Sequence, residues 1–158
     1  MTDKPEPITK VSIICASGDI ESVYATLIMS NGAVMEGMEA NIFFTFWGIN
    51  AVKKHSMNKI KTAVIGNPAM PIPSILGLIP GLSWLASKAM MWRMNQLDIP
   101  PVDEFLEMIQ AGGGRVFVCK AAVDMFMIKK EQLWDGVEDI ITVGKFYELA
   151  AGGQIIFT

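Results

Sequence analysis

Histidine, cysteine and charge are all scarce in this sequence, and each scarcity excludes a class of site. The only histidine is His55, which rules out a metal site built from several imidazoles and leaves a catalytic triad one possible base. Cys15 and Cys119 lie about a hundred residues apart, so they form neither a CxxC motif nor a disulfide scaffold. We therefore expect reduced thiols, a cytoplasmic location, and no metal or organic cofactor.

The charge pattern excludes further partners. Charged residues make up 18% of the chain, the net charge is −3, and no Lys/Arg cluster is interleaved with aromatics, so nucleic-acid binding is not expected. No GxGxxG or GxxxxGK[ST] phosphate loop is present, and the first ten residues lack the apolar core of a secretory signal. Hydrophobic residues reach 51%, so we expect part of the apolar surface to meet another subunit or a membrane.

Short apolar runs alternate with helical patterns along most of the chain. Glycines are expected to end two of the helices, at Gly37 and at 112–114. Strands are predicted at 10–15, 39–45, 116–118, 136–141 and 154–157, and helices at 20–36, 47–55, 101–111 and 142–151.

This alternation predicts one α/β domain over residues 1–158, a flavodoxin-like three-layer sandwich with a mainly parallel five-stranded sheet. In the flavodoxin-like order 2-1-3-4-5, the strands at 10–15 and 116–118 are neighbours. Cys15 and Cys119 both end their strands, so this order would bring the two thiols toward each other at the carboxyl edge of the sheet.

Residues 57–98 do not fit the alternation and predict an apolar helical insertion. No charged residue lies between Thr62 and Ser87, but prolines interrupt this stretch, which argues against a simple membrane span. We predict a helix over 75–94, broken near Pro80. The insertion is either a lid on its own domain, a subunit contact, or a membrane-surface contact.

Cys119 is the candidate for reactive chemistry. It ends an apolar run and opens a stretch with helical spacing, so a helix N-terminus and the adjacent Lys120 would stabilise its thiolate. Asp124, one turn further on, is either close to the thiol or an ordinary surface carboxylate. The alternative for Cys119 is a small buried hydrophobe, and Cys15 either resolves a modified Cys119 or is a buried strand residue.

Several short motifs carry a family resemblance. They are Ser17-Gly18-Asp19 (in which Ser17 or Asp19 is expected to cap a helix), Asn31-Gly32-Ala33, Gly37-Met38-Glu39, the block Phe43-Phe44-Thr45-Phe46-Trp47-Gly48, and Asp135-Gly136-Val137. With Cys119 and Asp124 at their spacing, the chain resembles the DsrE/DsrF-like sulfur-relay family, in its single-domain DsrE-like branch. Two positions depart from the family pattern, with Ala122 replacing a frequent serine and Met127 a frequent glycine.

The resemblance implies a parallel α/β sheet, a homo-oligomer, and a cysteine at position 119 that carries sulfur as a persulfide or thiosulfonate. It also implies rhodanese-like and TusA-type partners. We accordingly expect a sulfur carrier or sulfurtransferase centred on Cys119, with Asp124, Lys120, Cys15 and 17–19 in support. The alternative is a non-catalytic oligomeric scaffold that docks a soluble or membrane-linked partner through the insertion.

Overall fold

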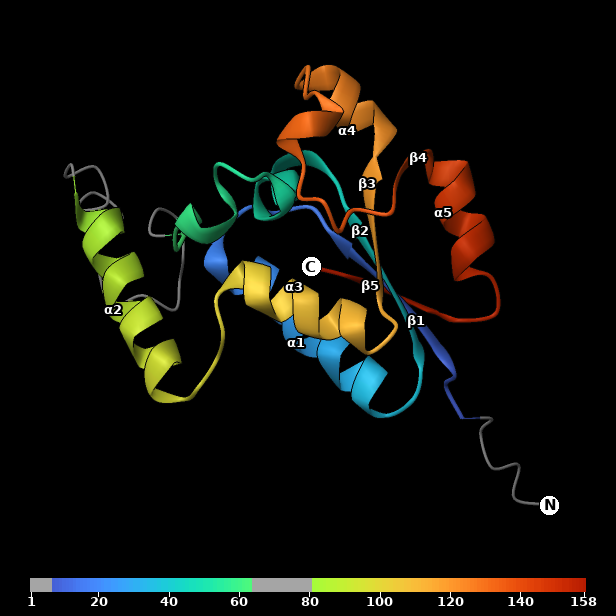
Figure 1. Ribbon diagram of the computed structural model, residues 1–158, viewed down its shortest axis with the longest axis horizontal. Coiled ribbons are helices and arrows are strands. Elements are labelled where there is room, and N and C mark those ends of the chain that lie inside the picture. The colour runs from blue at the N-terminus through green and yellow to red at the C-terminus, as the bar shows by residue number, and fades with distance from the viewer. Residues whose placement is uncertain (1–6, 64–80) are drawn as a thin grey trace.

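The computed structural model describes residues 7–63 and 81–158, and in these the chain forms a five-stranded, wholly parallel sheet (Figure 1). The fold class expected from the sequence, α/β with a parallel sheet between helices, is confirmed. The strands are β1 (Lys10–Cys15), β2 (Glu39–Phe44), β3 (Arg115–Cys119), β4 (Asp139–Ile141) and β5 (Gln154–Phe157).

The strand order is β4-β3-β2-β1-β5, so the expected order 2-1-3-4-5 is wrong. β2 pairs with both β1 and β3 and therefore separates them. Each of the first four strands is added beside its predecessor on the same side, and only β5 returns to pair with β1. Strands that follow each other in the chain usually become neighbours in the sheet, and here β3 accordingly pairs with β2, its predecessor, and not with β1.

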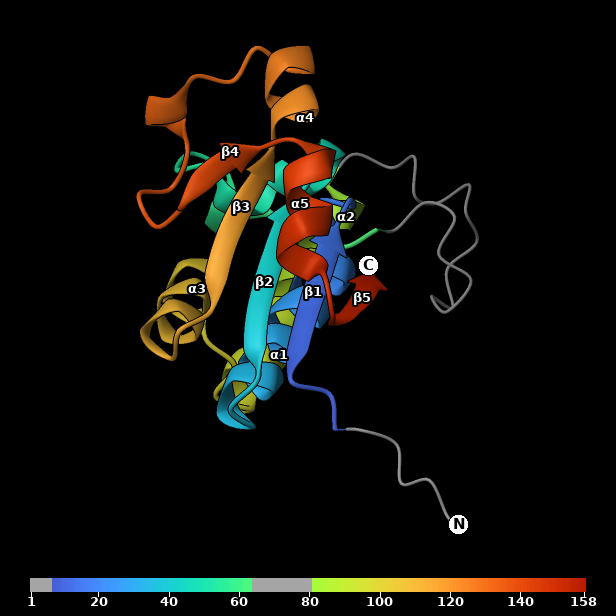
Figure 2. The same cartoon turned by 90° about the vertical axis from the view of Figure 1, so that its right-hand side faces the viewer.

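Helices cover both faces of the sheet, and the strand order explains which helix covers which face. Because β–helix–β crossovers are right-handed, connections running from β1 toward β4 lie on one face, and the return to β5 lies on the other. Accordingly, α1 and α3 pack on one face and α5 packs on the opposite face of β1 and β2 (Figure 2). The helices are α1 (Ile20–Met35), α2 (Leu82–Gln96), α3 (Val102–Ala111), α4 (Lys120–Met125) and α5 (Val143–Ala150).

The predicted boundaries hold to within a few residues, with two informative exceptions. The segment expected as a helix over 47–55 is a 3-10 helix, η1 (Phe46–Val52), after which Lys53 forms a β-bridge with Leu133. The strand expected over 136–141 begins three residues late, at Asp139. Two shorter 3-10 turns, η2 (Met57–Lys59) and η4 (Lys130–Gln132), also lie in these connections.

The core is concentrated on the central strands. β2 has five consecutive buried residues, 40–44, because both of its faces are covered. On one side Leu106 and Ile109 of α3 fill the space beneath the sheet, and on the other Phe146 of α5 packs on Phe43. This layered packing fixes the carboxyl ends of β1, β2 and β3, where the candidate site lies.

The insertion is described only in part. Helix α2 begins at Leu82, within the predicted helical range, whereas the expected break near Pro80 lies in 64–80, outside the described residues. Met90 and Met94 pack against the core, while Trp84 and Trp92 are exposed. No helix among the described residues is long and apolar enough to cross a bilayer. The choice between lid, subunit contact and membrane contact stays a prediction.

Candidate functional site

Cys119 lies at the junction of β3 and α4, as the sequence predicts. It is the last residue of the strand and the N-cap residue of the helix, with extended backbone angles. Its neighbour across the sheet is Ile141 at the end of β4. Only 4% of Cys119 is exposed, so the residue is buried at the carboxyl edge of the sheet.

Lys120 and Asp124 interact with each other on the exposed side of α4. Lys120 Nζ lies 3.1 Å and 3.3 Å from the two carboxylate oxygens of Asp124, an i,i+4 ion pair in which both side chains are more than half exposed. Such exposed pairs contribute at most about 1 kcal/mol to stability. Their main consequence here is electrostatic, because Asp124 offsets the cation that the sequence places beside the thiol.

Cys15 occupies the interior at the end of β1. It is fully buried, and its thiol donates to the Ser17 carbonyl oxygen at 3.5 Å. Burial raises the pKa of the Cys15 thiol above its ordinary value, which outweighs the opposing effect of hydrogen bonds with Thr26 and Thr158. Cys15 is therefore held as a neutral thiol inside the protein.

This shift predicts a loss of stability in alkali. Folding raises the pKa of the Cys15 thiol above its ordinary value of 9.0, so the neutral thiol contributes fully to the stability of the fold below pH 9.0. That contribution to stability is lost as the pH rises from 9.0 through the pKa of the folded state. We expect the Cys15→Ala variant to lose less stability than the wild type between pH 8 and pH 10, by up to about 1.4 kcal/mol. Urea unfolding at both pH values measures this difference, and parallel losses in the two proteins would contradict it. The pKa of Tyr24, raised to about 12 by burial, affects mainly a higher pH range.

The two thiols lie on opposite faces of the sheet. Cys15 is in register with Phe44, and Phe44 with Val118, so these three side chains share one face and Cys119, the next residue, points to the other. β2 also separates the two strands, whose backbones are thus about 10 Å apart. The structure does not bring the two cysteines together, which is the opposite of what the predicted strand order implied.

Residues 17–19 form the turn between β1 and α1. Asp19 caps the helix, because its carboxylate accepts hydrogen bonds from the backbone N–H of Ser22 at 2.9 Å and from its hydroxyl at 3.2 Å. At Gly18, a Cβ atom would lie 2.5 Å from the carbonyl oxygen of Trp47. Ser17 supplies the carbonyl that accepts from Cys15. Together, 17–19 hold the end of β1 against the segment that follows β2.

The block Phe43–Gly48 packs against that turn, and its residues make the close contacts and hydrogen bonds that join the two segments. Phe44 is fully buried, and Thr45 N–H donates to the carbonyl of Cys15 at 2.9 Å. Gly48 N–H donates to the carbonyl of Ala16 at 3.0 Å, and a Cβ there would lie 2.2 Å from the carbonyl oxygen of Cys15. The two motifs therefore interlock, each with one glycine where no side chain fits.

Met127 departs from the family pattern at a position where the backbone favours glycine. Its φ is 49°, in the left-handed region, and it follows the C-cap Phe126. Met127 N–H donates to the carbonyl of Asp124, and Ile128 N–H to that of Val123, which is the hydrogen-bond pattern of a Schellman motif. A glycine would adopt this conformation without strain, and the methionine instead exposes 85% of its surface beside α4.

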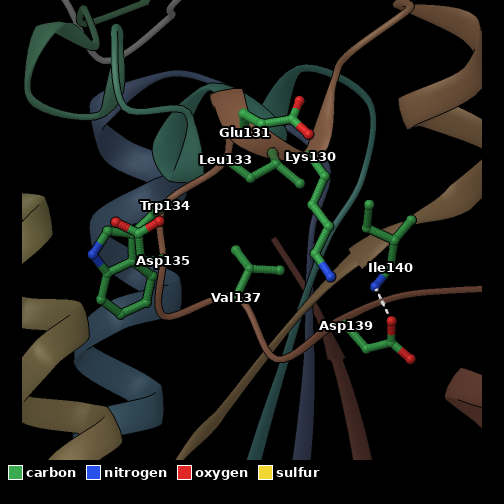
Figure 3. Close-up of a pocket in the computed structure, with 8 residues that line it drawn as sticks. All are labelled: Lys130, Glu131, Leu133, Trp134, Asp135, Val137, Asp139 and Ile140. Atoms are coloured by element: carbon green, nitrogen blue, oxygen red, sulfur yellow. Dashed lines mark hydrogen bonds between the residues drawn. The ribbon is translucent and has the colours of Figure 1, made fainter.

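Two features of this region could not be found from the sequence. The rings of Trp47 and Phe126, 79 positions apart in the chain, pack with centroids 4.8 Å apart and join η1 to the end of α4. Beside β4 there is a pocket of about 290 Å³, and Figure 3 shows Lys130 reaching over it toward Ile140. Its lining residues are Lys130, Glu131, Leu133, Trp134, Asp135, Val137, Asp139 and Ile140. Neither cysteine lines this pocket, and the only histidine, His55, is exposed in the turn after η1.

Comparison with known proteins identifies the family. The model of the DsrE/DsrF/DrsH-like family matches residues 8–157. The chain belongs to this family. Over 154 residues, the chain is 29% identical to a relative, the sulfur carrier protein DsrE2 of Allochromatium vinosum. The alignment covers 92% of this chain and 95% of that protein. It is 27% identical to the uncharacterized protein YrkE of Bacillus subtilis, covering 84% and 86%.

Solved structures share the fold of this DsrE/DsrF/DrsH-like protein. A protein of unknown function, MTH1491 from Methanobacterium thermoautotrophicum, superposes with a TM-score of 0.60 at 11% identity, covering 94% of this chain and 98% of that one. The YchN protein of E. coli gives a TM-score of 0.57 at 15% identity, covering 96% and 100%. At these identities the likeness extends to the fold alone.

Proposed function

We propose that this chain is a sulfur carrier that holds sulfane sulfur on Cys119 and passes it between partner proteins. The observation that carries the proposal is the position of Cys119 at the strand–helix junction on the carboxyl edge of the sheet, in a chain related over nearly its whole length to a sulfur carrier protein. Cys15, the other thiol, is fully buried and neutral. In line with the family resemblance, we propose rhodanese-like and TusA-type partners, a homo-oligomer and a cytoplasmic setting.

The transfer needs no cofactor, since it is a thiol exchange. The Cys119 thiolate attacks the outer sulfur of a donor persulfide, R–S–SH; the donor S–S bond breaks, Cys119–S–SH forms, and the donor leaves as R–S⁻. An acceptor thiolate then attacks the outer sulfur of Cys119–S–SH in the same way and regenerates the Cys119 thiolate. Because only 4% of Cys119 is exposed, the reaction requires a local opening at the junction of β3 and α4.

Mass spectrometry of the intact protein tests this proposal. After incubation with polysulfide or a small persulfide donor, the wild type is expected to gain about 32 Da, one sulfur atom, which a reducing thiol removes. The Cys119→Ala variant is expected to gain nothing, and Cys15→Ala to load like the wild type. A wild type without the addition would overturn the carrier function and favour the non-catalytic scaffold. Loading retained in Cys119→Ala would assign the sulfur to another residue.

A further inference from the structure

A group of apolar side chains, four exposed and one half-buried, lies on η1 and at the end of α4, the helix that begins after Cys119. It consists of Phe46 and Trp47 of η1, Met125 at the end of α4, and the following Phe126 and Met127; we call it the thiol-edge patch. Trp47 is 62% exposed and Met125 57%. Helix α4 starts directly after Cys119 and is only about 9 Å long at 1.5 Å per residue, so its C-terminal end, which carries Met125, lies about that far along the helix from the Cys119 backbone.

The patch belongs to one continuous surface made by two distant segments. Residues 45–56 and 120–135 lie side by side, since Lys54 N–H donates to the carbonyl of Gln132 and Trp134 N–H to that of Val52, at 3.0 and 2.8 Å. The packed rings of Trp47 and Phe126, tilted by 41°, join them again at the end of α4. In Figure 1 both segments lie at the carboxyl ends of β2 and β3. The apolar residues and the charges of these segments therefore face a partner together.

The charge of this surface is opposite to that of the rest of the chain. The two segments carry five lysines and three acids, a net +2, whereas the whole chain is −3, which leaves −5 for the remainder. Asp124 and Asp135 pair with Lys120 and Lys54. Among the described residues, Lys53 and Lys129 have no carboxylate within ion-pair distance. An acidic partner would be attracted to this edge and repelled from the others.

We propose that the thiol-edge patch, with Lys53 and Lys129, is the docking surface for an acidic protein partner that presents a cysteine persulfide among apolar side chains. This inference rests on the carrier function of Cys119 and adds the chemistry of its partner. Aromatic residues and methionine are enriched at protein interfaces, which fits Trp47, Phe126 and Met125. A second copy of this chain is disfavoured as the partner that binds this surface through its own copy of it, because two surfaces that each carry a charge of +2 repel each other.

The test compares two synthetic peptide persulfides, each with one central cysteine between leucines, one ending in glutamates and the other in lysines. At low ionic strength we expect the acidic peptide to load Cys119 roughly tenfold faster than the basic one. The preference is expected to vanish when the ionic strength rises from about 0.01 to about 1 M, where the Debye length falls from about 30 to about 3 Å. The double variant Lys53→Glu/Lys129→Glu should remove or reverse the preference for the acidic peptide. Trp47→Ala should lower the rate at which the acidic peptide loads Cys119 by roughly fivefold or more.

Matched variants outside the surface provide the controls. Lys88→Glu and Trp84→Ala change an exposed lysine and an exposed tryptophan of α2, and both should behave like the wild type. A small neutral persulfide should load all these proteins at the same rate. If it loads none of them, the carrier function is wrong. If it loads them while the two peptides react equally fast, or while Trp84→Ala slows the acidic peptide as much as Trp47→Ala, the docking surface is wrong and the carrier function stands.

Discussion

The Gly48→Ala variant is expected to lose more than about 3 kcal/mol of stability or to fail to fold. The added Cβ would lie 2.2 Å from the carbonyl oxygen of Cys15 and 2.8 Å from its carbonyl carbon, well inside van der Waals contact. Neither atom can move away easily, because that carbonyl accepts from Thr45 N–H and β1 is held between β2 and β5. Urea unfolding measures the loss, and the fraction of soluble protein measures it if the variant does not fold.

Two further variants make this expectation specific. Gly32→Ala places a Cβ in α1 with nothing within 4 Å and should stabilise the protein by about 0.5–1 kcal/mol, as an alanine does within a helix. The double variant Cys15→Ala/Gly48→Ala should be no more stable than Gly48→Ala, because the clash is with the backbone rather than the thiol. Rescue by Cys15→Ala, or wild-type stability of Gly48→Ala, would contradict the close approach described here.

Replacing Phe146 by alanine is expected to cost about 3–5 kcal/mol, the usual range for a buried phenylalanine. Phe146 is 1% exposed and stacks on Phe43 with ring centroids 4.7 Å apart. It lies on α5, the helix that covers this face of β1 and β2, so its loss leaves a cavity directly on the sheet. The midpoint of urea unfolding should fall with little change in slope.

The adjacent residue supplies the control for this prediction. Tyr147 lies on the same short helix and its ring contacts that of Phe146, but it is 60% exposed. Tyr147→Ala should therefore cost less than about 1 kcal/mol. Equal losses for Phe146→Ala and Tyr147→Ala would contradict the packing of the Phe146 ring on the sheet as the source of the expected effect.

Local features of the fold could be predicted from the sequence because they depend on neighbouring residues. Helix α3 follows Pro101 and ends at Ala111, before Gly112, and the run rich in β-branched residues at 10–15 forms a strand, as expected. The strand order could not be predicted, since the apolar runs are similar and their pairing depends on contacts between distant segments. β4 starts late because residues 134–137 form a turn, closed by a hydrogen bond from Val137 N–H to the carbonyl of Trp134 at 3.1 Å, so the backbone pairs with β3 only from Glu138 onward.

Some features of the candidate site could likewise be predicted from the sequence, and others could not. The strand–helix junction at Cys119 and the helix cap at Asp19 follow from local patterns, and both are observed. The face on which each thiol lies depends on strand order and register, which no local pattern contains. The contact between Trp47 and Phe126 likewise required the structure, because nothing near either residue indicates its partner.

The placement of the two cysteines on opposite faces of the sheet limits how a modified Cys119 can be restored. A disulfide requires its two Cα atoms within about 7 Å and its side chains directed at each other, so none can close between Cys15 and Cys119 within one folded chain. A sulfur or oxygen atom attached to Cys119 therefore has no internal reductant. Under the carrier function proposed above, its lifetime would depend on the concentration of outside thiols, so unloading would be bimolecular.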